Sequence, residues 1–110
     1  MIDPRLAERH LGTIAGGVAG HFGLRLQDMF SEEKSLGVAR PRMVAMYLAR
    51  ELLGYSLPRI GRYFGNRGHH AVIHACKVIP QLCETDPGIC DAVRELRASL
   101  SPPQPIGCDQ

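Results

Sequence analysis

The side chains best suited to binding chemistry gather between Arg40 and Lys77. This stretch holds seven basic residues against one acidic residue, a net charge of +6, whereas the remaining residues carry six basic and ten acidic groups, a net charge of −4. Guanidinium and ammonium groups bind phosphates, and a basic stretch of this kind is the electrostatic footprint of a nucleic-acid-binding surface. We therefore expect the centre of the chain to contact a polyanion, although the overall formal charge is only +2.

Three histidines, His69, His70 and His74, lie in the same stretch. Imidazole nitrogens donate and accept hydrogen bonds, so these side chains can read base edges, and His69 can also brace the preceding turn. His70 and His74 have the i, i+4 spacing of zinc ligands on a helix. A structural zinc site needs two further ligands, and Cys76 is expected on the opposite, apolar side. We predict no metal and no cofactor.

No residue set in the sequence predicts catalysis. There is no convincing Ser–His–Asp constellation, and no pair of carboxylates accompanies the histidines. The pattern G-x-x-x-x-G-K-[ST], whose loop cradles the phosphates of ATP, is also missing from the sequence. We expect neither an enzyme nor an ATP-binding protein.

A short helix is predicted just before the histidines. Its apolar positions recur at i, i+3, i+4 and i+7 on one face: Leu57, Ile60, Gly61 and Phe64. Ser56 suits the N-cap and Pro58 suits the first turn. A sharp turn should follow, because three residues tolerate positive φ or tight bends: Gly65, Asn66 and Gly68.

A second helix is predicted directly after this turn. Its spacing places four residues inward, Val72, Ala75, Cys76 and Ile79, and leaves four largely outward, His69, His70, His74 and Lys77. Two short helices joined by a glycine-bearing turn form a helix-turn-helix, which lays its second helix in the major groove of DNA. The basic stretch and the motif together predict a DNA-binding surface.

The earlier part of the chain predicts the supporting helices. Asp3 and Pro4 suit the start of an amphipathic helix that ends near His21 or Phe22, with Gly23 as C-cap. One further helical turn is expected at residues 26–30, with Leu26, Met29 and Phe30 inward. A polar loop is predicted at residues 31–37. Pro41 fits the first turn of the next helix, whose buried stripe is Val44, Ala45, Leu48, Ala49 and Leu52 and whose end is Gly54.

Proline shapes the end of the chain. Pro80 deletes a backbone hydrogen bond and crowds the Cys76 carbonyl, so we expect the second motif helix to kink or stop near Ile79. Asp86 and Pro87 then suit the N-cap and first position of a final helix that ends near Leu100. The sequence predicts one all-α domain over residues 1–100 and a disordered, proline-rich tail over residues 101–110.

Composition narrows the environment in which we expect the protein. A chain of 110 residues is long enough for one core but not for two. No apolar run approaches roughly 18 residues, and the N-terminus lacks the pattern of a secretory signal. The four cysteines therefore do not imply disulfides. We expect a cytoplasmic, nucleoid-associated protein with reduced thiols and no contact with membranes.

The segment from about Gly16 to Leu82 resembles the C-terminal DNA-binding domain of DnaA, the bacterial replication initiator. The matching motifs are Val38-Ala39-Arg40-Pro41-Arg42, Ser56-Leu57-Pro58-Arg59-Ile60-Gly61, Phe64-Gly65, Arg67, His69, Val72 and His74-Ala75-Cys76-Lys77. They keep the order and spacing of that family over well over half the chain. The resemblance implies an all-helical domain that binds double-stranded DNA.

The resemblance also implies which residues meet the DNA. It assigns phosphates to Arg42, Arg50, Ser56, Leu57 and Pro58, partly through backbone amides that lack helical partners. It assigns base edges to His69, His70 and Ala71, and a minor-groove loop to the vicinity of Lys34. The basic stretch adds Arg40, Arg67 and Lys77 to the predicted DNA-binding residues.

The chain departs from the family at several of these positions. Gly68 replaces an acidic residue, His70 and Ala71 replace threonines, and Glu32 and Glu33 stand in a loop that is normally basic. Binding of the initiator's own recognition sequence therefore does not follow. We predict sequence-specific binding of double-stranded DNA by a regulator of replication initiation or transcription, which can also have a protein partner in either process. The alternative is a protein-interaction module on the same fold that has lost base readout.

Overall fold

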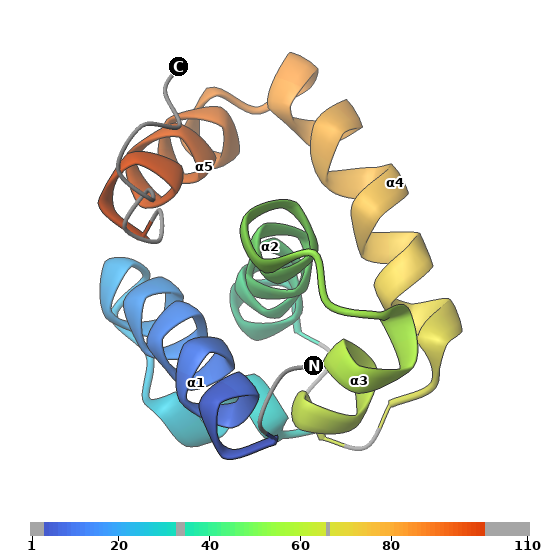
Figure 1. The fold of residues 1–110 in the computed structure, drawn as a ribbon. Coiled ribbons are helices and arrows are strands. Elements are labelled where there is room, and N and C mark those ends of the chain that lie inside the picture. Colours follow the sequence, from blue (N-terminus) through green and yellow to red (C-terminus); the bar gives the residue numbers. More distant parts are fainter. Residues whose placement is uncertain (1–3, 33–34, 66, 101–110) are drawn as a thin grey trace, which may run out of the picture.

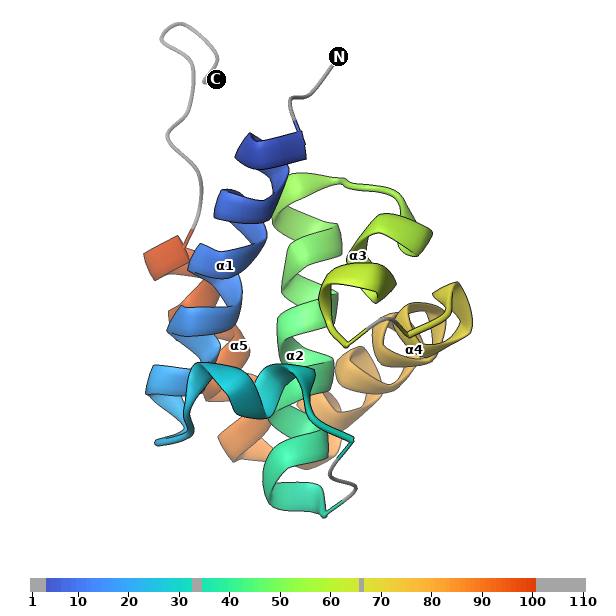
Figure 2. The same cartoon turned by 90° about the horizontal axis from the view of Figure 1, so that it is seen from below.

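Helix α2, Leu36–Leu53, runs through the middle of the molecule, and the other helices surround it (Figure 1). The computed structural model describes residues 4–32, 35–65 and 67–100, and this part of the chain contains helices and no strand. The surrounding elements are α1 (Pro4–His21), the 3₁₀ helix η1 (Leu26–Phe30), α3 (Leu57–Tyr63), α4 (His69–Thr85) and α5 (Pro87–Leu100). The predicted all-α fold is confirmed. Figure 2 shows α3 and α4 on one side of α2 and α1 and α5 on the other.

The core is centred on the apolar stripe of α2. Val44, Ala45, Leu48 and Ala49 are fully buried, as the sequence predicts, and Leu52 packs against the core from its edge. Side chains from every other helix close around this stripe, among them Ile14, Val18, Met29, Ile60, Phe64, Val72, Ile79 and Leu96. Burial of apolar surface on all sides of α2 is what holds the helices in place.

The predicted ends of α1 agree with the structure. The helix begins at Pro4 and ends at His21. Gly23 follows with a φ of +71°, a conformation that glycine adopts without strain. Just beyond it the Leu24 amide donates to the Ala19 carbonyl at 2.7 Å, which satisfies a carbonyl of the last helical turn.

Helix α2 begins earlier than the sequence predicts, and the prediction that Pro41 lies in the first turn is wrong. The helix starts at Leu36, inside the expected loop, and the Ser35 carbonyl accepts hydrogen bonds from Val38 and Ala39. Pro41 is therefore the sixth residue of the helix. Proline there removes only the bond to the Gly37 carbonyl, and Pro41 is itself buried.

The element at residues 26–30 forms, but one of its side chains points outward. Met29 is fully buried, and Phe30 packs edge-on against Tyr63 at 5.2 Å between ring centroids. Leu26, predicted to be inward, has 45% of its surface exposed. It opens a five-residue 3₁₀ helix that contacts the core through its C-terminal end, so the first position lies beyond the packed surface.

Helix α4 continues through Pro80, so a stop near Ile79, one of the two predicted outcomes, is wrong, while the alternative of a kink there stays a prediction. The helix runs without interruption to Thr85 (Figure 1). Ile79 is fully buried while Pro80 is exposed. The proline ring therefore faces solvent, and packing of the neighbouring turns against α2 and α5 outweighs the one lost hydrogen bond.

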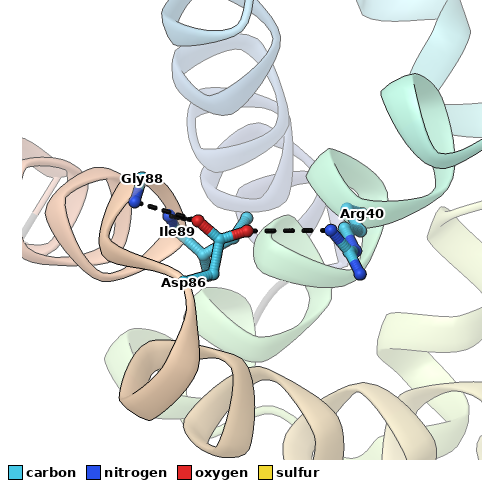
Figure 3. Close-up of polar contacts among 4 residues, drawn as sticks. All are labelled: Arg40, Asp86, Gly88 and Ile89. Carbon is cyan, nitrogen blue, oxygen red and sulfur yellow. Dashed lines mark hydrogen bonds and ion pairs between the residues drawn. The ribbon is translucent and has the colours of Figure 1, made fainter.

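The corner between α4 and α5 is held by one carboxylate. As Figure 3 shows, Asp86 Oδ1 accepts hydrogen bonds from the amides of Gly88 at 3.0 Å and Ile89 at 3.4 Å. Its Oδ2 lies 3.7 Å from Nη1 of Arg40 on α2. The predicted N-cap at Asp86 and the final helix to Leu100 are confirmed.

Some predictions concern residues outside the described part of the chain. These are the N-cap at Asp3, the turn residue Asn66, and the tail at residues 101–110. Within the described residues, no helix has the length and apolar character that a membrane crossing requires.

Candidate nucleic-acid interface

The turn between α3 and α4 depends on a close approach of two backbone segments. The Arg67 amide donates to the Gly61 carbonyl at 2.7 Å. A Cβ atom at Gly61 would lie 2.4 Å from the Arg67 carbonyl oxygen and 3.0 Å from that of Gly68. Such distances are too short for any side chain. Gly61 therefore lets the end of the turn pack directly on α3, which sets the angle at which α4 departs.

Gly65 gives this turn its sharp change of direction. Its φ is +88°, and a Cβ atom there would lie 2.6 Å from the Phe30 carbonyl oxygen. Both facts restrict the position to glycine. The predicted role of Gly65 in the turn is confirmed, and the structure adds that η1 packs against it.

Arg67 braces the turn from inside. Its guanidinium donates from Nη1 to the Phe64 carbonyl and from Nη2 to the Ser31 carbonyl, the latter at 2.6 Å. The turn is thereby tied to the end of η1, 36 residues earlier in the chain. In the structure, Arg67 therefore stabilises the turn, a role that its sequence position did not suggest. Its predicted contact with DNA stays a prediction.

The outer face of α4 is exposed to solvent over the first half of the helix. His69, His70, His74 and Lys77 are exposed, as predicted, and the inner positions Val72, Ala75 and Ile79 are fully buried. Cys76 is only half-buried, at the edge between the two faces.

The residues nearest the start of α4 have further features that suit contact with a ligand. The rings of His69 and His70 lie 4.2 Å apart between centroids. No side chain caps this end of the helix. The Ala71 amide donates to the Gly68 carbonyl at 3.1 Å, so only the amides before it remain for a ligand. Ala71 is half-buried.

The three arginines assigned to phosphates have different surroundings. Arg40 is about one-third exposed and pairs with Asp86. Arg42 is buried, with 5% of its surface exposed. Arg50 is exposed and donates from Nη1 to the Tyr55 carbonyl at 2.7 Å, which ties the end of α2 to the start of the motif. Of the three, Arg50 has the most accessible surface for a phosphate.

Arg50 also affects the thiol on α4. Burial raises the pKa of Cys76, the positive charge of Arg50 opposes that rise, and Glu51 adds to it. The Cys76 thiol therefore stays protonated at neutral pH and behaves as a small apolar group. This agrees with the interpretation of Cys76 as a packing residue.

The start of α3 is arranged as the sequence predicts. The Ser56 hydroxyl accepts from the Arg59 amide at 3.3 Å, and Pro58 lies in the first turn. Ser56 and Pro58 are exposed and Leu57 is half-buried against the core. Lys34, the remaining predicted DNA-binding residue, lies outside the described residues.

Two further exposed residues of the motif were not among the predicted DNA-binding residues. Arg62 is exposed on the outer side of α3. Ile73 has 40% of its surface exposed on α4, one helical turn after His70. The i, i+3 spacing from His70 was a usable signal for Ile73, but an isoleucine in an apolar helix suggests a core position. The described residues contain no cluster of three or more potential metal ligands.

Comparison with known proteins agrees with this geometry. A family model described as "Bacterial dnaA protein helix-turn-helix" matches residues 12–79. The chromosomal replication initiator protein DnaA of Symbiobacterium thermophilum is 44% identical over 90 residues, which are 82% of this chain and 20% of that protein. DnaA of Laribacter hongkongensis is 51% identical over 72 residues, 66% of this chain and 15% of that protein.

A solved structure shares the fold. A crystal structure of a DNA replication initiation factor superposes with a TM-score of 0.77 at 27% sequence identity, covering 87% of this chain and 29% of that chain. The chain thus spans about a fifth or less of the length of the curated relatives it matches. The matched residues include α2, α3, the turn and the first half of α4. This chain belongs to the bacterial DnaA protein helix-turn-helix family.

Proposed function

We propose that this protein binds double-stranded DNA by laying the first half of α4 in the major groove. The observation that carries the proposal is the exposed strip on α4 that contains His70, Ile73, His74 and Lys77. These residues follow one another at i, i+3, i+4 and i+7 and so line a single side of the helix. A helix with one free face is the element that the major groove of B-DNA accommodates.

The composition of the strip suits readout of base edges. The two imidazoles, at His70 and His74, can each donate a ring N–H to the acceptor atoms N7 and O6 of purines. Ile73 offers an apolar surface that fits the methyl group of thymine. The strip therefore supports sequence-specific binding.

The phosphate contacts that we propose come from the helices around the strip. Arg50, Arg62 and Lys77 are exposed on α2, α3 and α4. The uncapped amides at the start of α4 add a partial positive charge close to the same surface. Such contacts set the position and the salt dependence of binding without selecting a sequence.

The biological setting that we propose comes from the relatives. The proteins of Symbiobacterium and Laribacter are named chromosomal replication initiators. This chain corresponds to a small part of each, so we propose that it modulates replication initiation by occupying sites related to theirs. The same DNA-binding surface would also serve a regulator of transcription.

A mobility shift with random duplex DNA, followed by selection of the bound sequences, tests the proposal. Lys77→Ala and Arg62→Ala should weaken binding to all sequences about equally and lower the salt slope by about one unit each. His70→Ala and Ile73→Ala should instead change the selected sequence. Arg94→Ala is the matched control, because Arg94 is an exposed arginine on α5 outside the motif.

A protein-interaction module on the same fold is the second candidate function. It is favoured by Gly68 and Ala71, which lack the hydrogen-bonding groups usual at these positions, and by the engagement of Arg40 and Arg67 within the protein. Failure to retain duplex DNA at low salt, with the fold intact by circular dichroism, would favour this candidate over DNA binding.

A further inference from the structure

Tyr55 lies in the short connection that joins α2 to the first helix of the motif. It follows Gly54, the C-cap of α2, and precedes Ser56, the N-cap of α3. Its side chain is buried, with 7% of the residue's surface exposed. In Figure 2 this connection lies beside the first half of α1. The orientation of Tyr55 therefore depends on the groups that its side chain contacts inside the protein.

The Tyr55 hydroxyl contacts a histidine of α1. His10 Nδ1 and the hydroxyl oxygen are hydrogen-bonded at 2.9 Å, and the two rings are nearly parallel, at 15°. The hydroxyl can donate to an unprotonated Nδ1 or accept from a protonated one, so either ring tautomer satisfies the pair. His10 precedes residue 12, the first residue matched by the family model. The contact therefore joins the helix-turn-helix to a residue that the family match does not cover.

The same tyrosine holds two arginine side chains. Its carbonyl accepts a hydrogen bond from Nη1 of Arg50 at 2.7 Å. Its ring lies under the guanidinium of Arg59, whose Cζ is 5.5 Å from the ring centroid. A guanidinium is attracted to an aromatic face, and contact through the face leaves the N–H groups at its edge available for an anion. Tyr55 therefore links α1 to two cations.

These two cations lie beside the surface that we propose for DNA. Arg50 is exposed at the end of α2 and is one of the phosphate contacts proposed above. Arg59 is half-buried on α3 and lies three residues before Arg62, which is another of those contacts. Residues three apart are neighbours on the surface of a helix. Arg59 can therefore reach phosphates on the same side of α3 as Arg62.

We propose that His10 is a positioning residue for DNA binding, which acts through Tyr55 to hold Arg50 and Arg59 in place for phosphates. The inference rests on the proposed function and adds Arg59 as a further phosphate contact. An arginine side chain loses rotamer freedom when it binds a ligand, and it loses less when the fold already holds it. Without His10, the buried hydroxyl has lost its partner and a shift of Tyr55 toward water is favoured. Such a shift would release both guanidinium groups.

A double-mutant cycle on DNA affinity tests this inference. The variants are His10→Phe, Tyr55→Phe and the two substitutions together, because phenylalanine keeps a ring and removes the hydrogen bond. Each is measured by mobility shift with the duplex that the unsubstituted chain selects, over a range of salt concentrations and at a temperature where circular dichroism shows it folded. His21→Phe is the matched control, because His21 lies at the other end of α1 and pairs with Glu95 on α5.

We expect each single substitution of the pair to weaken binding about threefold to tenfold, whatever the DNA sequence. The salt slope should fall by about one unit, because phosphate contacts are lost. The double substitution should weaken binding no more than a single one, since both remove the same hydrogen bond. His10→Asn, whose amide can hydrogen-bond to the hydroxyl, should restore most of the affinity and of the slope. His21→Phe should change neither.

A chain with Arg50→Gln and Arg59→Gln shows whether His10 acts through the arginines. At low salt, His10→Phe should weaken binding no further in that chain, and an equal loss with and without the arginines would overturn the inference. A folded His10→Phe variant with unchanged affinity and salt slope would also overturn it, while DNA binding by the unsubstituted chain would leave the proposed function intact. Absence of binding by the unsubstituted chain would overturn both.

Discussion

The two corners at the ends of α4 are held by different kinds of interaction. The turn before α4 is a contact of backbone on backbone, in which Gly61 leaves no room for a Cβ atom and Gly65 has a positive φ. The corner after α4 is held by the side chain of Asp86, which caps α5 and pairs with Arg40 (Figure 3). A backbone contact fixes an angle rigidly, whereas side-chain hydrogen bonds and ion pairs adjust.

This difference matches the positions of the two corners relative to the proposed DNA-binding surface. The rigid turn sets the direction of the α4 strip that we propose for DNA reading. The adjustable corner lies at the opposite end of α4, beyond that strip. Substitutions should therefore have large effects at the turn and small effects at the corner.

Gly61→Ala should have the largest effect. The new Cβ would meet the Arg67 carbonyl at 2.4 Å, and backbone atoms cannot move aside cheaply. We expect a loss of about 2–3 kcal/mol in the free energy of unfolding, measured by urea denaturation. Gly16→Ala is the matched control, because the space around that helical position is open, and it should stabilise by about 0.5–1 kcal/mol. Equal effects of the two substitutions would contradict the close approach.

Arg67→Ala should have the next largest effect. It removes two hydrogen bonds that the guanidinium donates to the Phe64 and Ser31 carbonyls. We expect a loss of about 1.5–3 kcal/mol by urea denaturation. Arg67→Lys keeps the charge but cannot reach both carbonyls, so it should lose nearly as much. If the lysine variant is as stable as the unsubstituted protein, the bracing role is wrong.

Asp86→Ala should cost less, because only a cap is lost. We expect about 1 kcal/mol in the free energy of unfolding, the usual value for removal of an N-cap. Asp86→Asn keeps an acceptor for the Gly88 and Ile89 amides and should retain most of the stability. Thermal unfolding of both variants by circular dichroism measures the difference, and a larger loss for asparagine than for alanine would refute the capping role.

Arg40→Gln should have a smaller effect on stability than Asp86→Ala. The Arg40–Asp86 ion pair is about one-third exposed at 3.7 Å, and such pairs contribute at most about 1 kcal/mol. A change in DNA affinity much larger than this loss, measured by mobility shift, would mean that Arg40 leaves Asp86 to contact phosphate. Unchanged affinity would assign Arg40 to the corner alone.

The smallest expected effect is a pH dependence of stability from the half-buried thiols. The pKa values of Cys76 and Cys83 are raised in the folded protein, chiefly by burial. The folded state then binds more protons than the unfolded state. The stabilisation that these two thiols provide is therefore present at neutral pH and falls as the pH rises above about 8.5. Urea unfolding at pH 7.5 and pH 9.5 measures the fall, and the double substitution Cys76→Ser/Cys83→Ser should reduce it.

The sequence predicted the helical elements well where apolar spacing and capping residues agree. The stripe of α2, the capped start of α3, the buried side of α4 and the Asp86 cap all follow from local chemistry. One of its errors is Leu26, which was predicted to be inward but is exposed. Two others lie at prolines. Pro41 suggested a helix start and Pro80 a kink or a helix end, yet both lie inside helices. Local propensity was outweighed there by packing of the neighbouring turns.

Local sequence patterns did not predict the roles of the individual arginines. A basic stretch shows that cations are concentrated, but not which of them face solvent. Arg42 is buried, Arg67 reaches a carbonyl 36 residues away, and Arg50 holds the start of the motif. Such contacts join segments distant in the chain, so only the packed structure assigns them.

By itself, the amino-acid sequence determined an all-helical chain with a helix-turn-helix, because apolar periodicity, glycines and caps act over a few neighbouring residues. The tertiary structure decided which polar groups remain exposed and which hold the fold. It also placed Arg40 of α2 beside Asp86, at the corner between α4 and α5. The physical reason is that burial and long-range contacts depend on how the helices pack, and no short window of sequence contains that information.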